Sequence, residues 1–275
     1  MTVAAVPVGR KGALGASPTV PPAPVPPPWF AGVLVGFDLE TTGTDPSSAR
    51  VVTAAISYVA PSGAVLARSR EWIVDPGVEI PDGAQAVHGI STEQARRSGG
   101  PALTGLWEIL DELEAVCAAG LPLVVFNAPY DLTLMDAEAV RYGLPGLRGR
   151  RAFQRALVVD PLVIDRFVDP GRDGPRTLQA TAQAYGVPPD APHTASGDAL
   201  TACLVARSIG VRYPLVGAAE PARLHAAQQE WYRRRAVHVQ ASRRAHGDAD
   251  AVVDKGWPVY DGHPVWFVPR ETLAV

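Results

Sequence analysis

The stretch GVLVGFDLETTG, residues 32–43, decides the fold. Up to Leu39 it is an apolar run rich in strand-forming residues, which is typical of a buried strand. Asp38 and Glu40 lie at its carboxyl end, before a segment rich in turn formers. Alternate residues of a strand point to the same face, so both carboxylates are expected on one side of the sheet. The sequence therefore predicts a core strand that ends in two neighbouring negative charges.

Two more strands are expected at 51–59 and 64–74, joined by a Pro-Ser-Gly turn into an antiparallel meander. Beyond them, apolar residues recurring at three and four alternate with short apolar runs. These patterns predict helices at 102–119, 132–142, 177–185 and 196–209, and strands at 121–126 and 156–159. Three strands followed by alternating helices and strands indicate an α/β domain with a mixed five-stranded sheet flanked by helices.

The chain is expected to have three parts. Residues 1–29 form a Pro-rich, disordered leader, because eight of the 27 prolines lie in residues 1–28. Residues 30–212 hold the folded domain. Residues 213–275 form a basic helical appendage, with a helix at 221–245 and a C-terminal hairpin at 257–268. In that helix, Trp231 and Tyr232 precede three arginines, which suits single-stranded nucleic acid and a helix docked by its aromatics equally well.

Composition excludes several classes of protein. Hydrophobic residues make up 47% and charged residues 19%, enough for a sizeable core, and the net charge of −3 excludes a uniformly basic binder. Cys117 and Cys203 form no CxxC pair, which excludes a disulfide scaffold and a thiolate zinc site and favours buried thiols. Neither a membrane span nor a signal peptide is visible, so a cytoplasmic protein without membrane contact is expected.

Two further segments carry polar groups at strand ends or helix starts. Asn127 ends a buried apolar run and Asp131 opens the next helix, while His193 lies in a polar loop just before Asp198. Each has an ordinary explanation when taken alone. Asp131 and Asp198 suit the positive end of a helix dipole, His193 suits a surface loop, and acid pairs are common at solvated strand ends.

In their order and spacing, the segments 37–43, 127–131 and 193–199 together resemble the motifs of the DEDDh branch of the DnaQ-like 3′→5′ exonuclease family. This family includes the proofreading epsilon subunit of bacterial DNA polymerase. The resemblance covers about residues 33–210, and residues 86–91 also resemble a family loop near the substrate. It implies a ribonuclease H-like fold and a two-metal nuclease.

The resemblance implies a role for each acid. Two divalent cations, Mg²⁺ or Mn²⁺, prefer carboxylate oxygens and stabilise charge on the attacking and leaving oxygens of a phosphodiester. Asp38 is expected to contact both cations, Glu40 and Asp198 to complete one site, and Asp131 to belong to the other. His193 is expected to take the proton of the attacking water.

The resemblance also implies substrate contacts and a reaction. Thr41, Thr42, His88 and Asn127 are expected to approach the terminal nucleotide. The reaction is removal of nucleoside monophosphates from the 3′ end of single-stranded nucleic acid, more readily DNA than RNA. Alternatives are an exoribonuclease that trims short RNA or RNA 3′ ends, and a polymerase-associated nucleic-acid-binding subunit with a vestigial site. The complete set of four acids and a histidine argues against a vestigial site. Association with a DNA polymerase, a role in replication, repair or RNA maturation, and the oligomeric state all stay open.

Other residues invite comparison with these motifs. Phe126 and Tyr130 depart from the commoner His and Phe of the second motif, and neither is expected to touch the catalytic set. Asp160 is expected to cap a helix, and Asp165 and Asp169 to be solvated. Eight arginines between 141 and 176 either hold phosphates or form a solvated, Arg-rich loop; they are Arg141, Arg148, Arg150, Arg151, Arg155, Arg166, Arg172 and Arg176.

Overall fold

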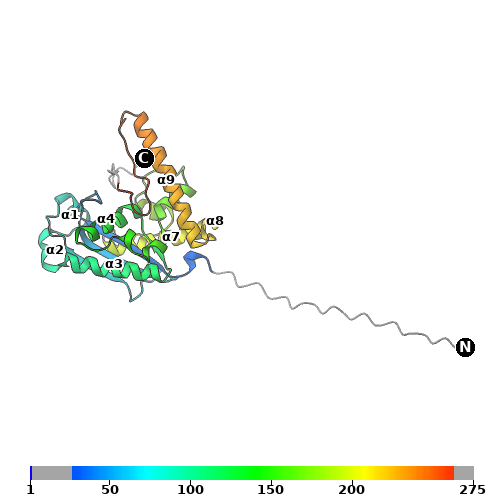
Figure 1. The fold of residues 1–275 in the computed structure, drawn as a ribbon, viewed down its shortest axis with the longest axis horizontal. Helices are drawn as coiled ribbons and strands as arrows, with labels where there is room; N and C mark the ends of the chain where they lie inside the picture. The colour runs from blue at the N-terminus through cyan, green and yellow to red at the C-terminus, as the bar shows by residue number, and fades with distance from the viewer. Residues whose placement is uncertain (2–26, 263–275) are drawn as a thin grey trace.

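The computed structural model describes Met1 and residues 27–262 (Figure 1). Its centre is a mixed sheet in the order β4-β3-β2-β1-β5-β6. The first three strands form the expected antiparallel meander, and β5 and β6 continue the sheet parallel to β1. The strands are β1 (Leu34–Thr41), β2 (Val51–Val59), β3 (Arg70–Asp75), β4 (Gly100–Pro101), β5 (Pro122–Val124) and β6 (Leu157–Val159).

The sheet has six strands in the described residues, so the expected count of five is wrong by one. The additional strand, β4, is a Gly-Pro pair that lies parallel to the end of β3. Neither residue favours a strand, so no local pattern announces it. The third expected strand also starts later than predicted, at Arg70, because Val65 forms only an isolated bridge with Val59.

The helices predicted from apolar spacing are present as α3 (Ala102–Ala118), α4 (Ala128–Arg141), α6 (Leu178–Ala184) and α7 (Ala195–Arg212). Helix α4 begins four residues earlier than expected, because Pro129 fits the first turn of a helix. Short helices that the spacing analysis did not list are α1 (Asp82–His88), α2 (Thr92–Ser98), α5 (Pro161–Val168) and α8 (Pro214–Gly217).

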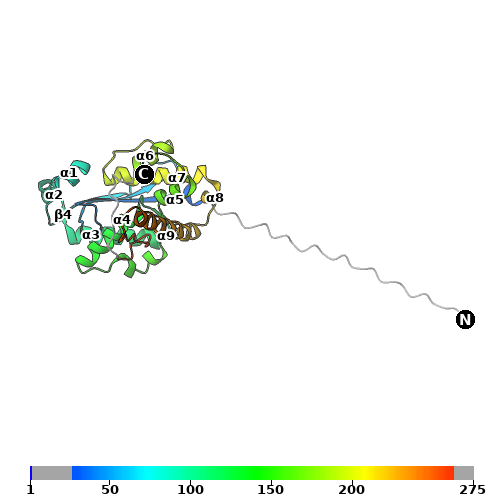
Figure 2. The same ribbon diagram turned by 90° about the horizontal axis from the view of Figure 1, so that it is seen from above.

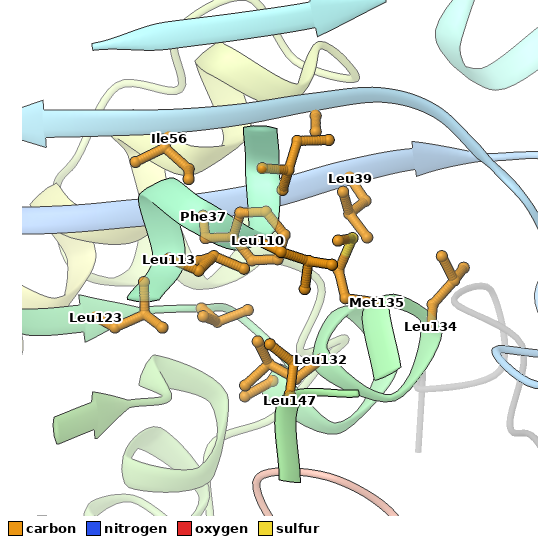
Figure 3. Close-up of a cluster of buried hydrophobic side chains, with 14 of the residues drawn as sticks. Phe37, Leu39, Ile56, Leu110, Leu113, Leu123, Leu132, Leu134, Met135 and Leu147 are labelled. Atoms are coloured by element: carbon orange, nitrogen blue, oxygen red, sulfur yellow. The ribbon is translucent and has the colours of Figure 1, made fainter. Parts of the chain in front are cut away.

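Helices cover both faces of the sheet (Figure 2). Helices α3 and α4 pack on one face, where Phe37 and Leu39 of β1 join the larger core cluster (Figure 3). Leu34 of the same strand faces α5 and α7 on the other side. Because side chains alternate along a strand, Asp38 and Glu40 share the face of α7. Helix α7 lies directly on β1, since a Cβ at Gly36 would be 2.3 Å from the Ala199 carbonyl oxygen.

The C-terminal helix α9 (Pro221–Ala245) has the predicted bounds and covers the edge strand β6. Val158 donates its N–H to His225 Nδ1 at 3.1 Å, and Gln228 Nε2 donates to the Val158 carbonyl at 3.0 Å. Trp231 stacks on Phe167 with ring centroids 3.7 Å apart. Of the two explanations for the aromatics of this helix, docking is therefore the one observed for Trp231.

The segment after α9 returns to the domain, where Trp257 is buried against His225. The expected hairpin at 257–268 extends beyond Gly262, so its second half lies outside the described residues. Most of the expected Pro-rich leader, residues 2–26, also lies outside them. At its end, Trp29 is buried and donates its indole N–H to the Val216 carbonyl at 3.0 Å.

Candidate functional site

Three of the predicted acids meet between β1 and the start of α7. One carboxylate oxygen from each of Asp38, Glu40 and Asp198 lies within 4.8 Å of the others. All three side chains are buried, with at most 4% of each residue exposed. The structure therefore joins the first and third motifs, which lie 158 to 160 residues apart in the sequence, into one cluster of negative charge.

Small residues allow this meeting. Ala55 on β2 packs against Ala195 and Ala199 of α7, which lets the helix approach the sheet beside the acids. The Thr194 side chain caps α7 by accepting the Gly197 N–H at 3.2 Å. Asp198 then lies in the first turn of α7, where the helix dipole favours a carboxylate.

Asp131 joins this arrangement from the other side of β1. It lies in the first turn of α4 and is 1% exposed. Its Oδ1 accepts the Leu39 N–H at 3.2 Å, and Leu39 lies between Asp38 and Glu40. The second motif is thus attached to the first, although Asp131 is not a member of the 4.8 Å cluster.

A cavity of about 350 Å³ opens beside the acids and is lined by Glu40, His88 and His193. His88 Nδ1 accepts the Ile90 N–H at 3.2 Å. Burial lowers the pKa of His88. His193 is exposed and adopts a left-handed backbone, with φ of 63°. Two predicted residues distant in sequence, His88 and His193, therefore share one pocket with a predicted metal ligand.

The other three predicted substrate residues do not line this cavity. Thr41 Oγ1 lies 2.5 Å from the Tyr130 hydroxyl, and Thr42 Oγ1 accepts the Arg50 N–H at 2.9 Å. Asn127 has a left-handed backbone with φ of 65°, and its N–H donates to Asp160 Oδ1 at 3.0 Å. These residues shape the loops around the acids, and substrate contact by them stays a prediction.

Glu71 is a pocket residue that the sequence did not reveal. It lies on β3, lines the cavity, and accepts a hydrogen bond from Ser196 Oγ at 2.8 Å. Side chains alternate along a strand, and Trp72 next to Glu71 is buried in the core. This alternation shows only that Glu71 lies on the opposite face of β3 from Trp72. Its position beside His193 depends on the packing of β3 near α7, which no local pattern encodes.

Of the acids expected to lie outside the site, Asp160 has the predicted role and Asp165 does not. Asp160 caps α5 as expected, accepting from Leu162 N and Val163 N. Asp165, expected to be solvated, is fully buried and paired with Arg172 at 2.8 Å and Arg176 at 2.6 Å. The apolar run that surrounds it in α5 and two arginines downstream were the available signal. Asp169 is partly exposed.

The arginine-rich segment is also partly structural. Arg172 and Arg176 neutralise Asp165, while Arg141 and Arg150 pair with Glu138 and Glu114. Four of the eight arginines thus have carboxylate partners within the fold, so fewer are available for phosphates than the sequence suggests.

The donor set of the cluster suits a divalent metal. Its ligand atoms are carboxylate oxygens, which hard cations such as Mg²⁺ and Mn²⁺ prefer over softer donors. Both cysteines are buried, as expected, and burial raises the pKa of Cys117 to about 12. A neutral thiol is a poor metal ligand, so the carboxylates are the groups that could hold a cation here.

A mixed α/β sheet with an acidic cluster at the end of its central strand is an arrangement that suits metal-dependent phosphodiester hydrolysis. Residues 35–206 match the RNase_T exonuclease family, which places more than half of the chain in one family match, and the chain belongs to that family. The expectation from the three motifs is thereby confirmed at the level of the family.

Individual relatives agree with this assignment. A DNA polymerase III subunit epsilon-like protein of Rhodobacter capsulatus is 29% identical over 167 residues, which are 60% of this chain and 22% of that protein. Exonuclease I of E. coli, solved in complex with a dT13 oligonucleotide, has a TM-score of 0.53 and 17% identity over 67% of this chain. Exonuclease I of Methylocaldum szegediense has a TM-score of 0.52 and 20% identity over 66% of this chain.

The chain spans 22% of the curated relative, 42% of the E. coli structure and 41% of the Methylocaldum structure. At these identities the solved structures show a shared fold. In the described part of this chain, none of the helices has the length and apolar character that crossing a membrane requires.

Proposed function

We propose that this chain is a two-metal 3′→5′ exonuclease that shortens single-stranded DNA and releases nucleoside monophosphates. The observation that carries the proposal is the convergence of Asp38, Glu40 and Asp198 beside a cavity that Glu40 shares with His193. Asp131 is attached to the same strand end through Leu39. Glu40 and the candidate base thus face one cavity that lies beside the other acids.

Each acid has a position that fits a role. Asp38 is proposed to contact both cations, Glu40 and Asp198 to complete one site, and Asp131 to serve the other. Bound there, two Mg²⁺ or Mn²⁺ ions would stabilise charge on the attacking and leaving oxygens of the phosphodiester. Without cations, three buried carboxylates within 4.8 Å of one another repel, which gives the site its affinity for positive charge.

His193 is proposed as the general base. It lines the cavity from an exposed loop, so water reaches its imidazole, and it precedes the first turn of α7 that carries Asp198. Its left-handed backbone costs a non-glycine residue on the order of 1 kcal/mol, a strain that proteins often keep at functional sites. Neutral imidazole accepts the proton of the attacking water.

The cavity fits the terminal nucleoside of a strand. Ile73 and Ile90 give it apolar walls for a base, and His88 approaches from α1. No lysine or arginine lines this cavity among the described residues. A phosphate is therefore proposed to be held by the cations that the acids would bind, with Thr41, Thr42 and Asn127 shaping the loops around it.

DNA is proposed as the substrate on the strength of the relatives. The solved E. coli exonuclease I structures include complexes with dT13 and dA16 oligonucleotides, and the curated relative bears the name of a polymerase epsilon-like subunit. These names describe those proteins. They favour single-stranded DNA for this chain, with association with a DNA polymerase as a second proposal that binding experiments with a polymerase can test.

The deciding experiment uses the purified full chain on 5′-labelled DNA and RNA strands of identical sequence, with Mg²⁺ or Mn²⁺. We expect a ladder shortened from the 3′ end, faster on DNA, and abolished by EDTA. Closed circular single-stranded DNA should survive, and Asp198→Asn is the inactive control. A faster RNA ladder would establish the exoribonuclease alternative. Cleavage of circles at a similar rate would exclude an exonuclease, and no cleavage of any strand would favour a vestigial site.

A further inference from the structure

The Tyr130 hydroxyl lies at a contact of three oxygen atoms between the first two motifs. It is 2.5 Å from the Gly43 carbonyl oxygen and 2.5 Å from Thr41 Oγ1. Thr41 Oγ1 is itself 2.8 Å from the Gly43 carbonyl oxygen. The sequence suggested that Tyr130 replaces a phenylalanine without touching the catalytic set. The structure adds that its hydroxyl contacts the loop that follows Glu40.

The protons of this triangle can be assigned. The Gly43 carbonyl only accepts, so the Tyr130 proton goes to it. The short contact between the two hydroxyls then needs the Thr41 proton, which Thr41 shares between the Tyr130 oxygen and the Gly43 carbonyl. Both hydroxyl protons are used within the triangle, which ties the loop after β1 to the start of α4.

The triangle of hydroxyl and carbonyl groups lies next to two of the proposed metal ligands in the sequence. Thr41 directly follows Glu40, and Tyr130 directly precedes Asp131. The register of β1 with β2 shifts between Glu40 and Thr41, so regular pairing does not fix the strand at this point. The Leu39 N–H bond to Asp131 Oδ1 lies on the other side of Glu40. Two hydrogen-bonded ties therefore flank Glu40 and join it to the helix that carries Asp131.

We propose that the Tyr130 hydroxyl is a positioning group that holds Asp131 and the Asp38–Glu40 strand end at the spacing required for binding two cations. The inference rests on the two-metal site of the proposed function. The ring alone does not supply this tie, because the buried ring packs in the core as a phenylalanine ring would. The hydroxyl reaches from that ring to the loop and sets the distance between the acids.

The test is calorimetric titration of Mn²⁺ into the metal-free full chain, without substrate. Tyr130→Phe removes one oxygen and should weaken the apparent Mn²⁺ affinity about tenfold, equivalent to about 1.4 kcal/mol. Its melting temperature should stay within about 4 °C of the wild type. Thr41→Val breaks the same triangle. Because Thr41→Val leaves the bond from Tyr130 to the Gly43 carbonyl, it should lose less affinity, and the double variant should bind Mn²⁺ about as well as Tyr130→Phe alone.

Tyr58→Phe is the matched control. The Tyr58 hydroxyl donates to Glu112 at 2.5 Å, and Tyr58 pairs with Val35 at the opposite end of β1 from the acids. This variant should keep wild-type Mn²⁺ affinity. Equal losses in Tyr130→Phe and Tyr58→Phe, additive losses in the double variant, or unchanged affinity in Tyr130→Phe would each overturn the proposal.

The same titration separates this inference from the proposed function. If the wild type binds Mn²⁺ and the variants behave as expected but no strand is hydrolysed, the exonuclease proposal fails and the positioning role stands. If the wild type binds no Mn²⁺, the positioning role is refuted together with the metal site.

Discussion

Asp160 directly follows β6, and the Asp38–Glu40–Asp198 cluster lies between β1 of the same sheet and α7. All four acids are at most 4% exposed. Asp160 accepts hydrogen bonds from four backbone N–H groups, those of Asn127, Ala128, Leu162 and Val163. The Trp257 indole N–H approaches the same carboxylate at 3.4 Å. In the cluster, by contrast, the groups that converge are other carboxylates.

This difference leads us to expect that the converging acids of the cluster, and not Asp160, hold a cation. Burial raises the pKa of Asp160, and the surrounding N–H groups oppose this effect. These N–H groups favour the charged form, although burial outweighs them and the pKa of Asp160 is raised overall. Acids that converge on one another gain most from a bound cation, which offsets both their repulsion and their desolvation.

The largest expected effect comes from Asp38→Asn. This change keeps the shape of the side chain but removes the charge proposed to contact both cations. Hydrolysis should fall by about 1,000-fold or more, and Mn²⁺ binding should be lost in calorimetry. Stability should stay equal or rise, because one of three crowded negative charges is gone.

Asp111→Asn, on the exposed face of α3, is the matched control and should change neither rate nor Mn²⁺ affinity. An Asp38→Asn variant with wild-type Mn²⁺ binding would show that the cluster is a structural group of acids. The partners of a buried acid would then not distinguish the cluster from Asp160.

A smaller effect is expected from His193→Ala, which tests a residue at the edge of the cluster. Loss of a general base should lower the rate about 100- to 10,000-fold while Mn²⁺ affinity stays near that of the wild type. If His193→Ala loses Mn²⁺ as Asp38→Asn does, the histidine is a ligand. Full activity would make it a bystander.

Much of this contrast was predictable from the sequence. A buried strand that ends in Asp38 and Glu40 is a local pattern, and so are the strand that leads to Asn127 and the helix start at Asp198. Strand alternation also places both acids of β1 on one face. The cap role of Asp160 followed from its position before Pro161, whose ring fits the first turn of a helix.

The rest depends on contacts between distant segments. The burial of Asp165 requires Arg172 and Arg176 to fold back onto α5, and the pocket position of Glu71 requires β3 to lie near α7. Tyr130 was correctly seen as an aromatic beside Asp131. Its hydroxyl, however, contacts Gly43 and Thr41, which lie 87 and 89 positions earlier in the sequence. No local periodicity predicts a contact over such a separation.

The third prediction concerns the structural acid. Asp160→Asn places an amide N–H₂ among backbone N–H donors, so one or more of them lose their acceptor. Unfolding free energy should fall by about 2 kcal/mol, measured by urea denaturation. Asp173→Asn, on an exposed loop, is the control and should change it little. If Asp160→Asn is as stable as the wild type, the N–H groups around Asp160 do not explain its burial.

The smallest expected effect is a pH dependence in the C-terminal region, where His225 accepts the Val158 N–H of the edge strand. Burial lowers the pKa of His225, and its neutral imidazole is the form that can accept the Val158 N–H. The unfolded chain therefore binds the proton more readily than the folded chain. The stabilisation is present above the unfolded pKa of about 6.5 and is lost as the pH falls through the folded pKa.

Urea midpoints at pH 7.5 and 5.5 measure this loss, which should be about 1 kcal/mol, the worth of one buried hydrogen bond. His225→Asn offers a similarly placed oxygen acceptor that does not titrate, so its midpoint should change less with pH. Part of the dependence should remain, because burial also lowers the pKa of His88. The exposed His238→Asn variant should keep the full wild-type dependence. If His225→Asn keeps it as well, helix α9 does not hold β6 through a neutral imidazole.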